Sequence, residues 1–243
     1  MNEAPGWLMQ APCFSNQSWK HGWSTARGPD FRGDPTLPEH SSSAEELIGA
    51  VGLAQAAWVR QVHRGTVLKA RQAGFAGEAD ALWTDRPGLG VIGRSADCPL
   101  VLVGGHRPDG SGVWGFAHSS WRSTVRGITV GLVMALAESG ADPVALQAVI
   151  CPSAGPCCYE VGEEVRQEAL ERLGPGAAWF FTEKSMRLTF DLWAANTEQL
   201  TTAGLREKNI HNVAHCTICG GDLYPSYRRQ GQAAGRFAAI IGA

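Results

Sequence analysis

The sequence predicts a mixed α/β protein that folds as one domain over residues 1–243. In the first half, short apolar runs with β-branched residues are separated by Gly and Pro, which indicates strands. In the second half, apolar residues recur at helical spacing. The chain is 44% hydrophobic and 18% charged, enough for a sizeable core, and no change of composition marks a domain boundary.

The first strands are predicted before a loop and a short helix. Residues 1–28 contain one or two strands that end at a Gly-bearing turn, and residues 29–44 read as a surface loop rich in Pro, Asp and Ser. Ser43 and Glu46 resemble a capping box for a short helix over 44–51. Four strand-like runs follow, at 56–62, 66–70, 80–84 and 89–93.

The central stretch, residues 94–124, predicts a β-hairpin. Its two apolar runs, 100–103 and 113–116, are joined by a segment that contains Pro108-Asp109-Gly110. This is a turn signal, because Pro presets φ and Gly accepts a positive φ. Pairing of the two runs would bring Cys98 close to His118, although 20 positions separate them.

Three helices are expected in the second half, with strands between and after them. The predicted helices cover 124–139, 163–173 and 192–203, and Asp191 is the expected N-cap of the last one. The predicted strands cover 145–150, 210–216 and 237–241.

Three possible metal ligands lie at the ends of predicted strands. His63 follows the run 56–62, Cys98 precedes one strand of the hairpin and His118 follows the other. Taken singly, such a histidine is more often a hydrogen-bonded structural residue than a ligand, and such a cysteine is more often a core thiol. Together they form a two-His, one-Cys set, and three protein ligands with an open fourth position are typical of a catalytic zinc site.

The other cysteines do not by themselves predict a second metal site. The chain has seven cysteines, an odd number, and no apolar signal segment at its start, so we expect a cytoplasmic protein without a disulfide framework. Cys216 and Cys219 form a single C-x-x-C pair, whereas a structural zinc site needs four ligands. We interpret the adjacent Cys157 and Cys158 as loop-packing residues.

Charge and motif content exclude several classes of function. The net charge is −2 without a basic stripe, which argues against a nucleic-acid partner, and no apolar run is long enough to cross a bilayer. The H-E-x-x-H, P-loop and G-x-S-x-G motifs are absent from the sequence. Among the arginines, Arg122 is the strongest candidate for binding an anion, because it lies near a predicted helix N-terminus.

The order of the motifs resembles the YfiH-type family over nearly the whole chain. The matching motifs include Q-V-H at 61–63, S-A-D-C-P at 95–99, A-H-S-S-W-R at 117–122, G-P-C-C-Y-E-V-G at 155–162, S-Y-R-R at 226–229 and G-R at 235–236. Members of this family were once labelled laccase-like polyphenol oxidases and are now read as zinc-dependent purine nucleoside phosphorylases. The resemblance implies layered mixed sheets flanked by helices.

The resemblance also implies a reaction and a set of site residues. It implies phosphorolysis of adenosine-, inosine- or guanosine-type nucleosides, with adenosine deamination and methylthioadenosine phosphorolysis as further activities. The implied partners are a purine nucleoside and phosphate, without nucleic acid or membrane, and the protein is expected to be a monomer or a weak homo-oligomer. The zinc ligands fall on His63, Cys98 and His118, with copper as the alternative metal.

We assign further residues to the expected reaction. Cys98, His118, Asp80 and Asp97 are the expected catalytic residues, the two aspartates either orienting ligands or transferring a proton. The residues expected to contact substrate are Arg27, Gln61, Ser95, Arg122 and Arg228.

Two other hypotheses stay open on the sequence. Cys98 could be the nucleophile of a cysteine hydrolase, activated by His118 and acting on an amide of a peptidoglycan precursor. Alternatively, the protein could bind a metal or a nucleoside without catalysis, because Ser119, Ser120 and Ser123 replace the usual small residues of the family around His118.

Overall fold

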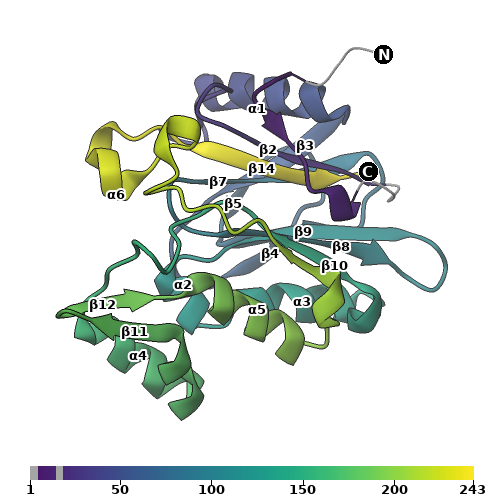
Figure 1. Cartoon of the computed structure of the whole chain (residues 1–243). Coiled ribbons are helices and arrows are strands. Elements are labelled where there is room, and N and C mark those ends of the chain that lie inside the picture. The colour runs from purple at the N-terminus through teal and green to yellow at the C-terminus, as the bar shows by residue number, and fades with distance from the viewer. Residues whose placement is uncertain (1–4, 15–18) are drawn as a thin grey trace.

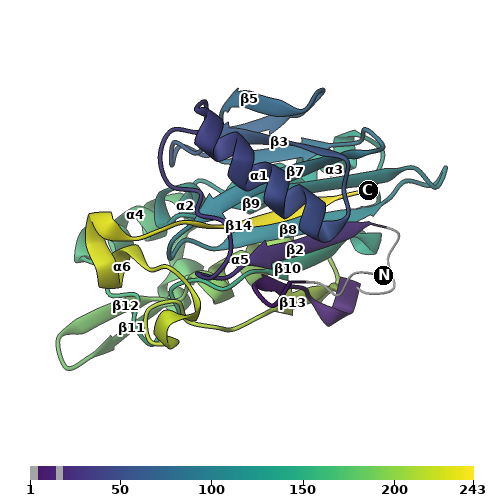
Figure 2. The same cartoon turned by 90° about the horizontal axis from the view of Figure 1, so that it is seen from above.

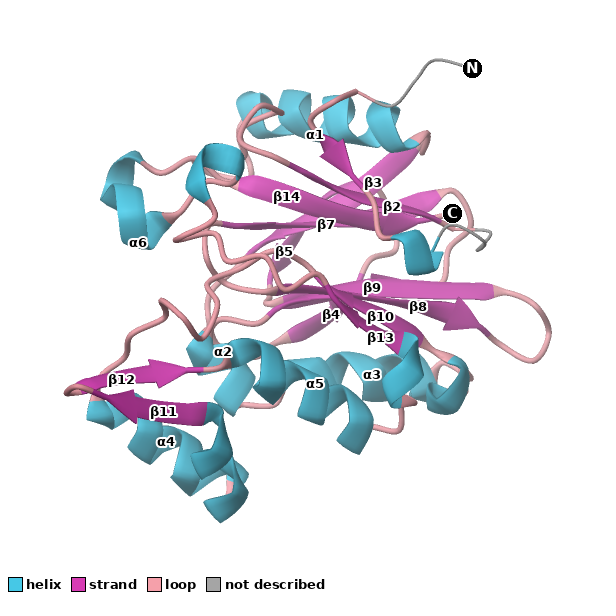
Figure 3. Ribbon diagram, in the orientation of Figure 1, coloured by secondary structure: helices cyan, strands magenta, loops and turns pink. Residues whose placement is uncertain are grey.

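Two six-stranded sheets lie face to face, and helices cover their outer faces (Figure 1). This computed structural model describes residues 5–14 and 19–243. Coloured by secondary structure, the layers follow one another as helix, sheet, sheet and helix (Figure 3). The mixed α/β fold with layered sheets is therefore confirmed. No helix of the described residues is both long enough and apolar enough to span a membrane.

The first sheet contains both terminal segments of the described chain. Its strands, in spatial order, are β1 (Leu8–Met9), β2 (Lys20–Ser24), β14 (Phe237–Gly242), β7 (Leu89–Ser95), β3 (Gln55–Arg60) and β5 (Gly74–Glu78). The last strand of the chain, β14, pairs antiparallel with β2 and with β7, so it lies in the centre of this sheet. β5 was not predicted, because its Gly-rich segment has no run of large apolar residues.

The second sheet contains the predicted hairpin. Its strands, in spatial order, are β13 (Ile210–Asn212), β10 (Gln147–Ile150), β8 (Leu100–His106), β9 (Gly112–His118), β6 (Ala81–Thr84) and β4 (Val67–Lys69). β8 and β9 pair antiparallel, with Leu100 opposite His118, and the turn between them includes Gly110 at φ +84°. The hairpin and its turn are confirmed.

Helices cover the two outer faces, and a small lobe extends from one end. The helices are α1 (Pro38–Val51), α2 (Trp121–Val125), α3 (Ile128–Glu138), α4 (Glu163–Leu173), α5 (Leu192–Thr202) and α6 (Tyr227–Gln230). Seen from above, α1 crosses the first sheet (Figure 2). The lobe consists of α4 and an unpredicted antiparallel pair, β11 (Phe181–Lys184) and β12 (Arg187–Phe190). Short 3₁₀ helices occupy Pro12–Phe14, Pro143–Ala145, Pro175–Phe180, Glu207–Asn209, Gly221–Leu223 and Gly231–Ala233.

Two predicted helix boundaries are wrong. The helix expected over 44–51 begins earlier, at Pro38, because proline is well tolerated in the first helical turn, and Ser43 donates to the Asp30 carbonyl instead of capping. The helix expected over 124–139 is two helices, because Gly127 adopts φ +72° and interrupts the helical hydrogen bonds. The helix over 163–173 and the Asp191 cap, which accepts from the Ala194 N–H at 2.9 Å, are confirmed.

Three apolar clusters hold the layers together. The largest lies between the sheets and includes Leu102, Phe116 and Phe237. A second packs α3 and α5 on the outer face of the second sheet, and a third packs α1 on the first. Since both faces of each sheet are covered, the central strands are apolar on both sides, as the continuous run 100–103 indicated.

We predict that His40→Leu will stabilise the protein and weaken its acid sensitivity. His40 in α1 is 2% exposed, packs between the Phe31 and Trp58 rings, and has no hydrogen-bond partner for either ring nitrogen among the described residues. Burial, with a smaller contribution from Arg94 and against the opposing effect of Asp34, lowers the pKa of His40 to about 4. The unfolded chain therefore takes up this proton first as pH falls, which costs roughly 3 kcal/mol of stability by pH 4.

Urea unfolding at pH 7.5 and at pH 4.5 would measure both effects. The leucine variant should gain about 1 kcal/mol at the higher pH and lose less on acidification than wild type. The control His40→Gln keeps a polar group that does not titrate, so it should lose the pH effect without the gain. An unchanged loss on acidification in both variants would contradict the prediction.

Candidate functional site

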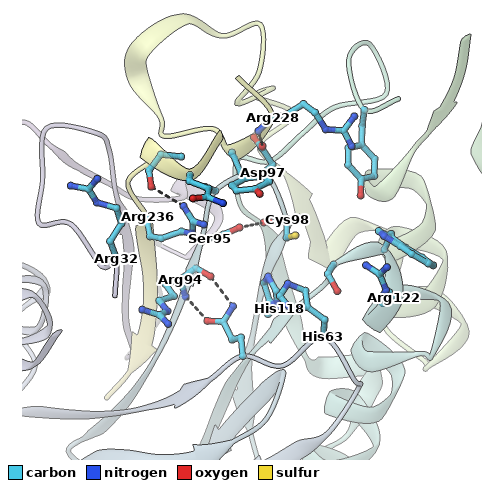
Figure 4. Close-up of a pocket in the computed structure, with 18 of the residues that line it drawn as sticks. Arg32, His63, Arg94, Ser95, Asp97, Cys98, His118, Arg122, Arg228 and Arg236 are labelled. Carbon is cyan, nitrogen blue, oxygen red and sulfur yellow. Dashed lines mark hydrogen bonds between the residues drawn. The ribbon is translucent and has the colours of Figure 1, made fainter. Parts of the chain in front are cut away.

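A pocket of about 650 Å³ opens where strands of both sheets end (Figure 4). Its walls come from the ends of β3, β7 and β9, from the residues that precede β8, and from the segment that contains α6. Asp97 is the one carboxylate among its lining residues. The lining also contains five arginines: Arg32, Arg94, Arg122, Arg228 and Arg236. The pocket is therefore strongly cationic although the whole chain carries a net charge of −2.

His63, Cys98 and His118 meet on one wall of this pocket. One ligand atom from each lies within 4.8 Å of the others, and the two imidazole rings are 4.9 Å apart at 76° to each other. In Figure 4 the Cys98 sulfur faces the two rings. The predicted convergence is confirmed. Two imidazoles, one thiol and an open side toward the pocket fit a zinc ion with three protein ligands.

The fold explains how these distant residues converge. Cys98 lies two residues before β8 and His118 ends β9, so the antiparallel pairing of the hairpin brings them together. His63 follows β3 in the neighbouring sheet and adopts the unusual φ of +59°. A non-glycine residue keeps such a conformation only where its surroundings impose it.

Asp80 imposes that conformation. The carboxylate is fully buried and accepts four backbone hydrogen bonds of 2.6–3.0 Å, from the N–H groups of Val62, His63, Arg64 and Gly65. Oδ1 also lies 3.6 Å from Nδ1 of His118, a buried nitrogen without a hydrogen-bond partner. Burial would raise the pKa of Asp80, but the His118 ring and these N–H groups outweigh burial and hold the pKa well below its usual range.

Cys98 and His118 shift each other's protonation. Burial raises the pKa of the Cys98 thiol, but the His118 and His63 rings outweigh burial and lower it. Burial lowers the pKa of His118, and the Cys98 thiolate and the Asp80 carboxylate raise it above its usual value. Both shifts favour a thiolate, which is the form that binds a metal or attacks a substrate.

Asp97 joins three segments of the pocket wall. Its Oδ1 accepts from the Thr217 hydroxyl and its Oδ2 from the Arg228 backbone N–H, both at 2.6 Å. Its carbonyl accepts from the Ala154 N–H at 2.7 Å. Asp97 adopts φ +98° and is 7% exposed, so its conformation is set by these contacts.

The comparisons with known proteins agree with this fold and site. The family described as "Multi-copper polyphenol oxidoreductase laccase" matches residues 39–243. This chain belongs to that family. The crystal structure of YlmD from Geobacillus stearothermophilus superposes on the whole chain and on 97% of its own length, with a TM-score of 0.82 at 27% identity. The YfiH-type family that the motifs resemble is thereby confirmed.

Curated relatives in the family carry enzyme names. A purine nucleoside phosphorylase of Deinococcus radiodurans is 34% identical over 98% of this chain and 94% of its own length. A purine nucleoside phosphorylase of Aquifex aeolicus is 36% identical over 63% of this chain, and the match spans 65% of that relative's length. A protein of an unknown prokaryotic organism, 33% identical over 65% of this chain and 59% of its own length, is named adenosine deaminase RL5.

Most of the residues assigned to this YfiH-type site line the pocket. His63, Cys98, His118, Arg122 and Arg228 line the pocket with their side chains. Gln61, Ser95 and Asp97 line it as well, but their polar side-chain atoms are already hydrogen-bonded.

The hydrogen bonds of Gln61 and Ser95 hold the pocket backbone. The Gln61 amide donates to the Arg94 carbonyl at 2.7 Å and accepts from the Arg94 N–H at 2.9 Å. The Ser95 hydroxyl donates to the Cys98 carbonyl at 2.6 Å. Both side chains therefore join neighbouring backbone segments around the possible metal ligands.

Two residues assigned from the sequence lie outside the pocket lining. Asp80 lies behind His118, and Arg27 is exposed at a turn away from the pocket. Three arginines were missed, namely Arg32, Arg94 and Arg236. Only Arg236 had a signal in the sequence, because the G-R pair at 235–236 is one of the motifs of the YfiH-type family.

The pocket arginines differ in how far they are already engaged. Arg32 pairs with Asp30, and Arg94, Arg228 and Arg236 donate to backbone carbonyls. The Arg122 guanidinium instead stacks over the Trp121 ring at 4.3 Å, and it has no hydrogen bond or ion pair with any of the described residues. Its guanidinium is therefore free to bind an anion in the pocket.

Proposed function

We propose that the chain is a zinc-dependent purine nucleoside phosphorylase. The observation that carries this proposal is the shared wall of the pocket, where the His63–Cys98–His118 set and the unengaged Arg122 face the same cavity. The names of the relatives support the same reaction class. The cavity of about 650 Å³ is within the usual range for small-molecule sites, about 300–1,000 Å³.

The reaction requires an anion site beside a site for the nucleoside. Phosphate attacks the anomeric carbon of the sugar as the purine leaves, and positive charge develops on the sugar ring in the transition state. Arg122 is the proposed phosphate ligand, because a free guanidinium can donate two parallel hydrogen bonds to phosphate oxygens. The other pocket arginines raise the local positive potential and attract the anion.

The possible metal ligands are the proposed reactive centre. His63, Cys98 and His118 would hold zinc, which when bound supplies Lewis-acid polarisation of an oxygen ligand. Asp80 fixes the His118 ring from behind and holds the backbone of His63. An acceptor behind a ligating histidine orients the ring and increases its basicity.

The two aspartates are proposed as positioning residues rather than proton carriers. Asp80 accepts four N–H groups and lies outside the pocket lining, and both carboxylate oxygens of Asp97 are occupied. A carboxylate whose oxygens are already held by these partners cannot turn toward a substrate. Of the two roles that the sequence left open for these residues, orientation of the ligands has the better support.

A nucleoside panel with purified protein tests the proposed function. Inosine, adenosine, guanosine and methylthioadenosine are each incubated with and without phosphate, and base, sugar phosphate and deaminated product are measured by chromatography. We expect phosphate-dependent base release that is lost in His118→Ala and in the milder Cys98→Ser. If a zinc-loaded wild-type sample released no base from any of the four nucleosides, the proposal would be wrong.

We predict that Arg122→Ala will weaken the use of phosphate selectively. A charge-assisted hydrogen bond contributes about 1.5–3 kcal/mol, so kcat/KM for phosphate should fall roughly 10- to 100-fold. The KM for inosine should change little, and Arg122→Lys should be intermediate because it keeps the charge without the planar fork. The control is Arg172→Ala on the exposed side of α4. Equal losses for phosphate and inosine would contradict this assignment.

One observation favours the cysteine hydrolase as a second candidate. The lowered pKa of Cys98 beside the raised pKa of His118 is also the pattern of a nucleophilic thiolate with a general base. Metal content separates the two mechanisms, because a hydrolase needs the thiolate free. Full activity on an amide substrate after zinc removal would favour the hydrolase.

The serines around His118 do not favour a purely binding protein. Ser120 accepts from the Ser123 N–H at 3.2 Å and caps α2, while the Ser123 hydroxyl donates to the His118 carbonyl at 2.7 Å. Ser119 pairs with Thr129. These side chains are hydrogen-bonded locally and stabilise the turn that follows His118.

A further inference from the structure

Four cysteines gather at a second place, outside the possible ligand set of the pocket. Ligand atoms of Cys157, Cys158, Cys216 and Cys219 all lie within 4.8 Å of one another. They come from two segments far apart in the sequence, the loop after β10 and the segment after β13. The interpretation of Cys157 and Cys158 as loop-packing residues is therefore incomplete, because the fold supplies the other half of a four-thiol cluster.

The sulfur positions match a single tetrahedral ion. Four thiolates about 2.3 Å from zinc lie roughly 3.8 Å apart from one another. The Cys157 and Cys219 sulfurs are 3.6 Å apart, and no pair in the cluster exceeds 4.8 Å. All four thiols are free, and the sulfurs are too far apart for a disulfide, which needs about 2.05 Å.

Backbone hydrogen bonds fix the two segments that carry the cysteines. The Gly155 N–H donates to the Cys216 sulfur at 3.3 Å. In one segment the Cys158 N–H donates to the Gly155 carbonyl at 3.0 Å, and in the other the Gly220 N–H donates to the Cys216 carbonyl at 2.8 Å. Each pair of cysteines therefore lies on its own hydrogen-bonded turn, and the two turns face each other.

We propose that Cys157, Cys158, Cys216 and Cys219 bind a structural zinc ion. Four thiolate ligands leave no open position for a substrate, which distinguishes this site from the three-ligand set of the pocket. An all-sulfur set favours soft metal ions, and zinc is the common one with tetrahedral geometry. Each thiol gives up its proton when the ion binds.

The proposed ion would fix one wall of the pocket. Thr217 lies inside the C-x-x-C turn, and its hydroxyl donates to Asp97, the neighbour of Cys98. The loop that carries Cys157 and Cys158 continues to Tyr159, and the Arg228 guanidinium lies over the Tyr159 ring at 5.1 Å. Joining the two turns therefore holds Asp97, Tyr159 and Arg228 in place without a contact between the ion and the substrate.

Metal counting on site-specific variants tests the proposal. Protein purified under reducing conditions without chelator is analysed by native mass spectrometry and elemental analysis. We expect two zinc ions per wild-type chain, one in the double variant Cys157→Ser/Cys219→Ser and one in His118→Ala. The control Cys13→Ser, which changes an exposed thiol outside both clusters, should keep two.

The two variants separate this site from the one in the pocket. A single zinc that is lost in His118→Ala but kept in the double serine variant would overturn the four-cysteine site and leave the proposed function intact. Iron or copper in place of the second zinc would overturn the assignment of the metal. A mass lower by two hydrogen atoms in the non-reduced protein, with no second metal, would show a disulfide and overturn the site.

A measurement on the wild-type protein remains decisive if the double variant does not fold. The bound zinc is replaced by cobalt, and the maleimide labelling of each cysteine is mapped by peptide mass spectrometry. Bound cobalt should give intense thiolate-to-cobalt absorption and protect the exposed Cys157 and Cys219, while the exposed Cys13 stays reactive. Equal labelling of these three thiols in the metal-loaded protein would contradict the proposal.

Discussion

Replacing Asp80 with alanine should destabilise the protein by about 3–5 kcal/mol and remove most of its affinity for metal in the pocket. The change leaves four partly buried backbone N–H groups without an acceptor and releases His63 from its φ of +59°. It also removes the carboxylate beside Nδ1 of His118. Loss of such a partner behind a ligand typically weakens metal binding 10- to 100-fold.

Asp80→Asn tests the negative charge of the side chain while keeping its volume. The asparagine amide keeps the size of the side chain but turns a donor toward backbone N–H groups, so it should still cost about 2–3 kcal/mol. The control is Asp85→Asn, which breaks a partly exposed ion pair with Lys69 and Arg107 and should cost about 1 kcal/mol without affecting metal binding. Urea unfolding measures the loss of stability, and chelator competition measures the loss of metal affinity. Equal losses in Asp80→Asn and Asp85→Asn would contradict the role of Asp80.

Asp97→Ala should cost about 2–4 kcal/mol and lower kcat/KM about 100-fold. The variant leaves the buried Thr217 hydroxyl and the partly buried Arg228 backbone N–H without their acceptor. It also places alanine at φ +98°, which adds backbone strain. Because Cys98 is the next residue, a displacement of this turn misplaces a proposed metal ligand, and small misplacements are costly in catalysis.

Two further variants divide this effect into its parts. Asp97→Asn tolerates the left-handed backbone and keeps one acceptor, so its loss of stability should be about half that of alanine. Thr217→Val removes a single hydrogen bond and should cost about 1 kcal/mol. Stability from urea unfolding and kcat/KM for inosine are measured on all three. An alanine variant no worse than Thr217→Val would argue against Asp97 as the junction of the three segments.

The possible metal ligands could be predicted because each follows or precedes a recognisable strand. The Pro-Asp-Gly turn at 108–110 defines the register of one hairpin, and that register alone brings Cys98 to His118. His63 joins them because parallel and antiparallel pairing within a layered fold brings strand ends of the two sheets to one side. These inferences need only local turn chemistry and the alternation of apolar runs.

The pocket arginines and the four-cysteine cluster could not be predicted in the same way. Arg32 and Arg94 reach the pocket from a loop and a strand that meet only after α1 packs on the first sheet. The two cysteine pairs lie about 60 residues apart, in segments with little regular structure, and no periodic pattern links them. Such contacts depend on how loops pack, which propensities and periodicity do not encode.

The amino-acid sequence by itself determined the α/β class, the central hairpin and the set of His63, Cys98 and His118. It also predicted helices over 163–173 and 192–203, which in the structure cover 163–173 and 192–202. Local hydrogen bonding, turn residues and apolar periodicity are enough for these features. Only the tertiary structure decided which arginine is left unengaged, that Asp80 lies behind the cavity, that the Asp97 carboxylate is occupied by Thr217 and Arg228, and that four thiols meet. Those properties depend on partners supplied by distant segments, so they exist only once the sheets have stacked.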